Sequence, residues 1–131
     1  MDDKLKILLV DDEQDFLETT TKRLARRGYE VRSAMKCSDA IDLIGSVWPE
    51  VVVLDVMLPD KDGILCLKEI KQQWPALVVI LLTGHASMQA GRQSLEYGAN
   101  DYCLKPIELD ELVEKIKIAY RETTGSKPAV P

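Results

Sequence analysis

The strongest constraint on the fold is an alternation between short apolar runs and longer helical patterns. Three runs, at residues 5–10, 51–54 and 77–82, are continuous and rich in Val, Ile and Leu. Such runs are typical of parallel strands that are covered on both faces. Two further segments, 29–33 and 101–105, alternate apolar with polar or small residues, which favours edge strands with less cover. The chain therefore predicts five strands, two of them at sheet edges.

Helical patterns follow each predicted strand. Apolar residues recur at helical spacing in residues 16–24, 40–44, 64–74 and 109–120. A weaker helix is expected at residues 86–99, where apolar residues are sparse. The repeated Trp-Pro steps at 48–49 and 74–75 are expected to end two of the helices before a buried strand.

Five β–α units in this order predict an α/β fold with a doubly wound (βα)5 arrangement, a parallel sheet with helices on both faces. The second and fifth strands have the edge-strand pattern, so the predicted strand order is 2-1-3-4-5. The predicted domain covers residues 1–122. Residues 123–131 have no periodic pattern and are expected to form a flexible tail or the start of a linker.

Composition narrows the possible functions. The chain has 131 residues, enough for one domain, and a net charge of −5, which argues against nucleic acid as a direct ligand. Apolar stretches fall short of the roughly 20 residues that span a bilayer, and acids flank the first apolar run, unlike a signal peptide. We therefore expect a cytoplasmic protein without a membrane partner.

The three cysteines are expected to be ordinary thiols. Cys37, Cys66 and Cys103 form no CxxC pair, and the chain has a single histidine, His85, so a zinc site is excluded. We expect half-buried free thiols in a reducing compartment, and a solvent-facing loop position for His85.

Carboxylates gather where a doubly wound sheet binds ligands. Asp11 and Asp12 follow the first strand and Asp55 ends the third, and in the predicted order these strands are neighbours at the point where strand order reverses. Three carboxylates this close should not stay ionised together without a cation, and few, partly solvated oxygen ligands suit Mg²⁺. Asp15 and Asp62 are instead expected to be helix caps or solvated loop acids, and for Asp12 alone a capping role is an open alternative.

Residues at two more strand ends are expected to lie beside these carboxylates. Thr83 ends the fourth strand and Lys105 the fifth. A hydroxyl, an ammonium group and a cation around one carboxylate suit a phosphoryl group on that carboxylate.

Taken together, these residues resemble the receiver domains of two-component response regulators. The resemblance covers residues 4 to about 121 and depends on "LLVDDE", "VVLDVMLPDKDG", "LLTGHA" and "GANDYCLKP", in the order and spacing of that family. It implies a flavodoxin-like fold.

The resemblance also implies roles for individual residues. Asp55 would accept a phosphoryl group from a histidine of a sensor kinase or phosphotransfer protein. Asp11, Asp12, Asp55 and the backbone carbonyl of Met57 would hold Mg²⁺, whereas Thr83 and Lys105 would bind the phosphoryl oxygens. Lys105–Pro106 matches a peptide bond that is cis in the family. Such a domain assists its own phosphorylation and dephosphorylation but is not a turnover enzyme.

Switching is expected at Thr83 and Tyr102, since Tyr102 occupies the position of the family's rotating aromatic residue. The surface made by the fourth helix, fifth strand and last helix would contact a downstream effector, and a phosphorylation-dependent homodimer is a further expectation. Met57, Gly84 and His85 match positions that tune phosphate loss. An apolar Met57 cannot position an attacking water, so we expect a long-lived phosphoryl state.

Three alternative functions are less well supported. A phosphatase of the haloacid dehalogenase type needs a second aspartate two residues after the nucleophile, where this chain has Met57. A flavin-binding protein needs a phosphate-binding loop after the first strand, where "VDDEQD" would repel phosphate. A phosphate-independent interaction module would not need the complete set of acids, hydroxyl and lysine.

Overall fold

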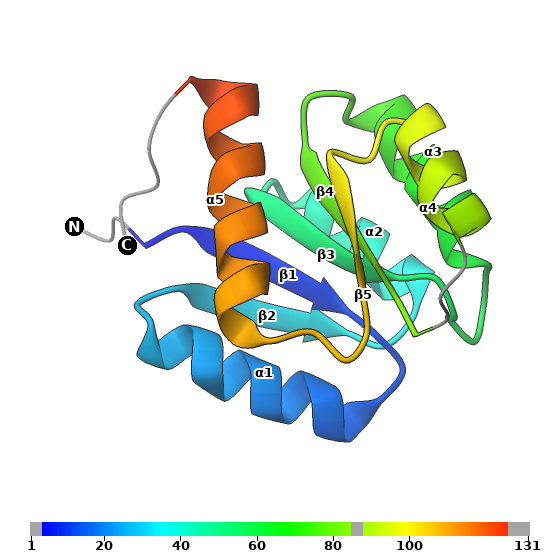
Figure 1. Ribbon diagram of the computed structural model, residues 1–131. Helices are drawn as coiled ribbons and strands as arrows, with labels where there is room; N and C mark the ends of the chain where they lie inside the picture. The colour runs from blue at the N-terminus through cyan, green and yellow to red at the C-terminus, as the bar shows by residue number, and fades with distance from the viewer. Residues whose placement is uncertain (1–3, 85–87, 126–131) are drawn as a thin grey trace.

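The computed structural model describes residues 4–84 and 88–125, which form a three-layer α/β domain (Figure 1). Strands and helices alternate along the described chain, as the apolar pattern predicts. Their order and bounds are β1 Lys6–Val10, α1 Gln14–Arg26, β2 Glu30–Ala34, α2 Cys37–Gly45, β3 Val51–Asp55, α3 Gly63–Gln73, β4 Val78–Thr83, α4 Met88–Glu96, β5 Asp101–Leu104 and α5 Leu109–Thr124.

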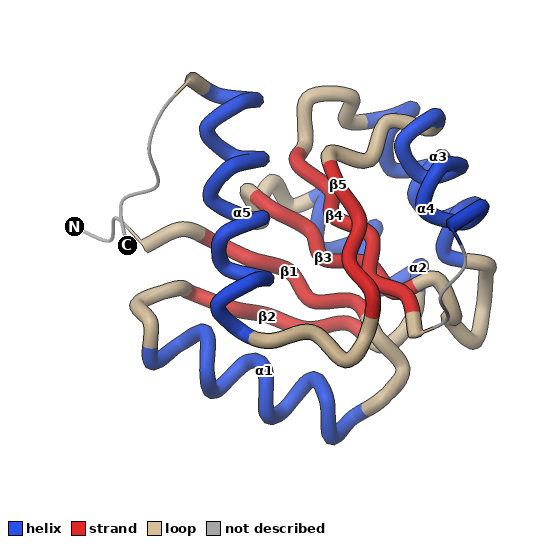
Figure 2. Tube along the Cα trace, viewed as in Figure 1, coloured by secondary structure: helices blue, strands red, loops and turns tan. Residues whose placement is uncertain are grey.

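The sheet has the predicted order, β2-β1-β3-β4-β5, and all its strands are parallel. Helices α1 and α5 cover one face, and α2 and α3 cover the other, with α4 beside α3 (Figure 2). The predicted flavodoxin-like doubly wound fold is therefore confirmed.

The central strands are apolar at every position because their side chains point alternately to the two covered faces of the sheet. In β1, Ile7 and Leu9 join the core under α1 and α5, whereas Leu8 and Val10 join the core under α2 and α3. Because neighbouring residues of a strand point to opposite faces, a strand covered on both faces needs apolar residues at every position. Strand β2 lies at the edge, and Arg32 is exposed there.

Two helix ends differ from the predictions. Helix α2 ends at Gly45 rather than at Trp48, and the intervening turn contains Val47 with a φ of 60°, in the left-handed region. Helix α5 continues to Thr124 and ends at Gly125, which has a φ of 73°. The helix therefore extends two residues into the predicted tail, and residues 126–131 lie outside the described residues.

The expectation of three free thiols is wrong. Cys37 and Cys66 form a disulfide, and their Cα atoms are 5.9 Å apart. Cys37 begins α2 and Cys66 lies in the first turn of α3, and these two helices pack on the same face of the sheet. Their separation of 29 residues hid this proximity at the sequence level. Cys103 is free and buried.

The described helices are also too short or too polar to cross a bilayer, so none of them is a candidate membrane span.

Candidate functional site

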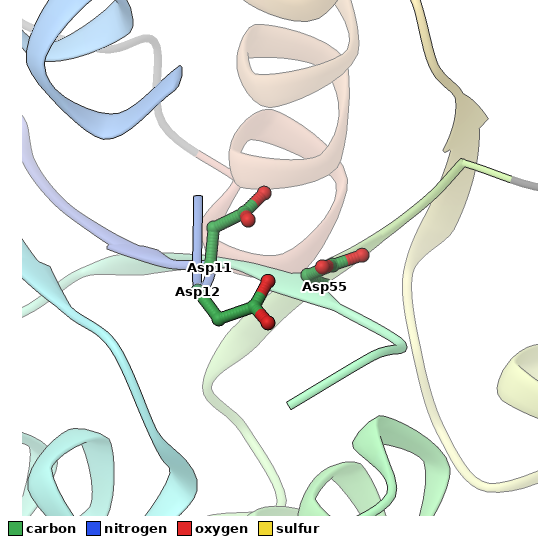
Figure 3. Close-up of side chains that lie close together, drawn as sticks. All are labelled: Asp11, Asp12 and Asp55. Carbon is green, nitrogen blue, oxygen red and sulfur yellow. The ribbon is translucent and has the colours of Figure 1, made fainter. Parts of the chain in front are cut away.

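Strand register brings two of the predicted carboxylates together. Val10 pairs with Leu54 across β1 and β3, so the next residue of each chain segment, Asp11 and Asp55, reaches the same edge of the sheet. Both side chains are buried, and Asp12 beside them is exposed. One carboxylate oxygen from each of the three residues lies within 4.8 Å of the others (Figure 3). The predicted acidic cluster is therefore present.

The surroundings of Asp55 make its charge unfavourable. Burial, followed by repulsion from Asp11, raises the pKa of Asp55 from 3.8 to about 6. Lys105 and the backbone N–H groups of Met57 and Val56 lower this pKa but only partly offset the rise. A group that binds at this carboxylate and brings positive charge would relieve that cost.

Lys105 is the cation nearest to these acids among the described residues. Its Nζ donates to Asp11 Oδ2 at 2.5 Å and to Glu13 Oε1 at 3.1 Å, and lies 3.9 Å from Asp55 Oδ2. Burial lowers the pKa of Lys105, but the bonds to Asp11 and Glu13 outweigh that effect and raise it above the usual value. The ammonium also lies 4.5 Å from the centroid of the Phe16 ring.

Sequence reasoning did not assign Glu13 or Phe16 to the site. Both follow the acidic pair at the start of α1, and both contact Lys105. The available signal was their position: residues in the first turn after β1 lie at the same sheet edge as the strand ends. Asp15 is an exposed acid in the first turn of α1, in agreement with its predicted structural role.

The other predicted site residues come from the ends of β4 and β5. Thr83 is the last residue of β4 and is buried, and its carbonyl accepts a hydrogen bond from the Lys105 N–H at 2.7 Å. The Lys105–Pro106 peptide bond is cis, as the resemblance implied. Tyr102, on β5, is half-buried against the core under α2 and α3. Gly84 is exposed, and His85 lies outside the described residues.

The loop after Asp55 is held at both ends. Its residues 56–62 connect β3 to α3, and Met57 pairs with Asp62 in an isolated antiparallel bridge. Asp62 caps α3, accepting a hydrogen bond from the N–H of Ile64 at 2.7 Å, in agreement with its predicted role. The N–H of Gly63 donates to Val56 O at 2.6 Å.

Asp60 links the same loop to α2. Its Oδ1 accepts a hydrogen bond from the N–H of Cys37 at 2.8 Å, and its Oδ2 accepts one from the N–H of Ser38 at 3.0 Å. These bonds lower the pKa of Asp60. A cap supplied from a loop more than 20 residues away was not visible in the sequence.

The donor set at the sheet edge fits a small divalent cation. Carboxylates without sulfur or imidazole ligands favour a hard ion, and an exposed Asp12 leaves room for bound waters. Burial, and after it repulsion from Asp11, raises the pKa of Asp55, and a cation bound between the carboxylates would offset both effects.

Comparison with known proteins identifies the family. Residues 7–117 match the family model for the response regulator receiver domain. The chain belongs to this family. The receiver resembles the response regulator MprA of Mycolicibacterium vanbaalenii, with 36% identity over 120 residues, which cover 92% of the receiver and 52% of MprA. It is also 36% identical over 107 residues to the regulatory protein AtoC of Escherichia coli, covering 82% of the receiver and 23% of AtoC. The receiver thus spans about half the length of one relative and a quarter of the other.

Solved structures agree with this assignment. A CheY-like receiver domain protein from Methanospirillum hungatei has a TM-score of 0.88 and 32% identity, over 93% of the receiver and 98% of that chain. A Francisella response regulator receiver domain gives a TM-score of 0.85 and 30% identity, over 92% of the receiver and all of that chain. The chain is therefore the receiver domain of a two-component response regulator.

Proposed function

We propose that Asp55 accepts a phosphoryl group from a phosphohistidine of a sensor kinase or phosphotransfer protein. The observation that carries this proposal is the meeting of Asp55 with Asp11, Asp12 and Lys105 at the switch point of the sheet. The domain would hold the phosphoryl group as a signal and assist its own phosphorylation and dephosphorylation, without acting as a turnover enzyme.

Asp55 has the properties of a usable nucleophile. With a pKa of about 6 it is mostly ionised at neutral pH, and its basicity exceeds that of an ordinary aspartate. One carboxylate oxygen would attack phosphorus while the bond from phosphorus to the histidine nitrogen breaks. Lys105, 3.9 Å from Asp55 Oδ2, is placed to stabilise negative charge on the transferring oxygens. The Thr83 hydroxyl would donate a hydrogen bond to one of those oxygens from the neighbouring strand end.

We propose Mg²⁺ as the cofactor, held by Asp11, Asp12, Asp55 and the backbone carbonyl of Met57. When bound, the cation would neutralise charge on the phosphoryl oxygens and on the carboxylates. The cluster geometry and the loop between Met57 and Asp62 support this assignment. The exposed side chain of Met57 offers no hydrogen bond to an attacking water, which supports a long-lived phosphoryl state.

The output surface proposed for the receiver consists of α4, β5 and α5. Phosphorylation would draw Thr83 toward the new oxygens and reposition Tyr102, changing the surface that an effector or a second receiver contacts. Matched relatives include a protein named as a DNA-binding transcriptional regulator, NtrC of Proteus hauseri, of which the receiver covers 26%. The proposed effector is thus a separate domain or protein, and the proposed location is the cytoplasm.

Phosphorylation by acetyl phosphate tests the proposal directly. The protein is incubated with acetyl phosphate and Mg²⁺, and its intact mass is measured. We expect one phosphoryl adduct in the wild type and in Asp15→Asn, which removes an exposed acid outside the cluster. The adduct should be absent in Asp55→Asn and without Mg²⁺. An adduct that persists in Asp55→Asn would refute the assignment.

A further inference from the structure

The disulfide between Cys37 and Cys66 is not explained by the proposed phosphoryl chemistry. It joins the first residue of α2 to the first turn of α3, and both sulfur-bearing residues are almost fully buried. Glutathione and thioredoxin keep most thiols reduced in the cytoplasm, where the receiver is proposed to act. A disulfide in that compartment is usually transient and responsive to redox conditions.

The bond lies against the loop that follows Asp55. The N–H of Cys37 donates to Asp60 Oδ1 at 2.8 Å. Cys37 is therefore bonded both to Cys66, through the disulfide, and to the loop, through Asp60. Lys61 of the loop donates to Glu69 Oε2 at 2.9 Å, and this oxygen lies 3.9 Å from Cys37 Sγ. These contacts connect the disulfide to the middle of the loop.

The second cysteine is linked to the end of the loop. The N–H of Cys66 donates to Asp62 O at 2.9 Å, and Asp62 pairs with Met57. Gly63 follows Asp62 in the chain. It packs so closely on the backbone of Asp55 and Val56 that an added Cβ would lie 2.3 Å from Asp55 O. A continuous set of contacts thus connects both sulfur-bearing residues with the backbone of Asp55.

We propose that Cys37 and Cys66 are a reversible redox modification site whose disulfide holds the loop after Asp55 in place. Reduction would remove the covalent link between α2 and α3 and loosen residues 56–62. The effect on phosphorylation rests on the proposed function of Asp55, whereas the redox chemistry and the loosening of the loop do not.

The co-reactants are thiols and disulfides. A dithiol reductant attacks one sulfur as its thiolate, which breaks the Cys37–Cys66 bond and forms a mixed disulfide. Its second thiol then displaces the protein thiolate, so two electrons and two protons pass to Cys37 and Cys66, and the reductant is left as a disulfide. In the reverse direction, oxidised glutathione takes the two electrons and leaves as two molecules of glutathione.

Attack on the disulfide requires local opening, because both cysteines are buried, and we expect that opening at Cys37. Its neighbours Lys36 and Ser38 are exposed, and it begins the helix. Opening the first turn of α2 breaks the bonds from Cys37 and Ser38 to Asp60 and uncovers the sulfur. The cap from Asp60 therefore controls how fast the disulfide is reduced.

The redox chemistry is tested by titrating the full chain with reduced and oxidised glutathione. Samples are quenched with acid, unfolded, alkylated with N-ethylmaleimide and weighed intact. We expect one alkylated cysteine under oxidising conditions and three under reducing conditions. The buried Cys103 should account for the constant thiol, so Cys103→Ser should change these counts to zero and two. Three alkylated cysteines at every glutathione ratio, or a disulfide that includes Cys103, would overturn the proposal.

Hydrogen exchange tests the link to the loop, using the reduced and oxidised wild type so that no variant has to fold. The N–H groups of Cys37, Ser38 and Gly63 should exchange about 2- to 30-fold faster after reduction, the range expected for couplings of this kind. The matched control is Asn100, whose N–H bonds to Val79 O on β4 just before β5, and its rate should not change. Equal rates in both forms at Cys37, Ser38 and Gly63 would overturn the link.

Acetyl phosphate labelling of the two forms separates this inference from the proposed function. Faster labelling of the oxidised form supports the link, and equal labelling of both forms overturns its effect on the site. If neither form is labelled, the proposed function of Asp55 fails, and the glutathione titration and exchange rates still decide the redox proposal.

Discussion

Asp55 illustrates how one residue can store unfavourable free energy in a folded domain. The residue is 4% exposed and lies beside the buried Asp11, so its ionised form loses hydration and meets a like charge. This unfavourable arrangement persists in the folded state because strand β3 fixes the position of the side chain. The same cost makes Asp55 responsive to any added positive charge or to loss of its own charge.

Neutralising Asp55 should stabilise the protein at neutral pH when divalent cations are removed with EDTA. The folded pKa of about 6 lies above the reference value of 3.8, so the folded state binds the proton more tightly. Stability of the wild type should therefore fall as pH rises from about 4 through 6, by at most about 3 kcal/mol. In Asp55→Asn this loss should disappear, which urea unfolding at pH 5 and pH 7.5 would measure.

Asp12→Asn is the control, because it neutralises an exposed member of the same cluster. Its unfolding free energy should keep most of the wild-type dependence on pH. An Asp55→Asn variant that loses as much stability between pH 5 and pH 7.5 as the wild type would contradict the electrostatic explanation.

Residues differed in how far their roles were predictable from the sequence. Asp11, Asp55 and Lys105 were found because each ends or directly follows a strand, and parallel strands end at one edge. Asp60 and the Cys37–Cys66 pair were missed, because their contacts join loops and helix starts whose relative position depends on packing. The order of the strands predicts which strand ends lie side by side, whereas no comparable pattern predicts a single polar contact between a loop and a helix.

At the scale of elements, the connection from β3 to α3 is unusually close. An added Cβ at Gly63 would lie 2.3 Å from Asp55 O and 2.5 Å from Val56 Cα. These are backbone atoms of the strand end that carries the site, so they cannot move aside cheaply. The helix must begin with glycine here for the strand to deliver Asp55 in its observed position.

Gly63→Ala should therefore lower the free energy of unfolding by about 1–3 kcal/mol, as overpacking usually does, and should slow acetyl phosphate labelling of Asp55. The control is Gly45→Ala at the end of α2, where the added Cβ would lie 4.0 Å from the Trp74 ring, an ordinary contact. Urea unfolding of both variants measures the difference. Equal stability of the two variants would argue against the close approach as the reason for glycine.

Elements were predictable in type but less so in length. The buried strands were recognised because both faces are covered, so apolar residues fill every position. The end of α2 was misplaced by three residues, since Ser46 and Val47 form a turn before Trp48 that the Trp-Pro step does not signal. Helix α5 extends to Thr124, where Asn100 Nδ2 donates to Thr123 Oγ1. The helix ends only at Gly125, whose φ of 73° lies in the left-handed region.

At the scale of the whole molecule, the winding of the sheet concentrates charge at one edge. Three acids and a lysine from β1, β3 and the end of β5 meet there, although they are separated by up to 94 residues. A cation that binds the three acids contacts segments from the first and middle thirds of the chain at once. It should therefore stabilise the native state globally rather than locally.

Mg²⁺ should raise the unfolding temperature of the receiver, because the cluster exists only in the folded chain. At a concentration one hundred times its dissociation constant, a ligand of this kind adds about 2.7 kcal/mol, or roughly 10 °C for a domain of this size. Thermal unfolding in EDTA and in increasing Mg²⁺ measures the shift. Asp12→Asn should reduce it strongly, whereas Asp15→Asn should keep it, because Asp15 is exposed in the first turn of α1 and outside the cluster. Equal shifts in both variants would mean that Mg²⁺ acts by general screening of the net charge of −5 rather than by binding between the strand ends.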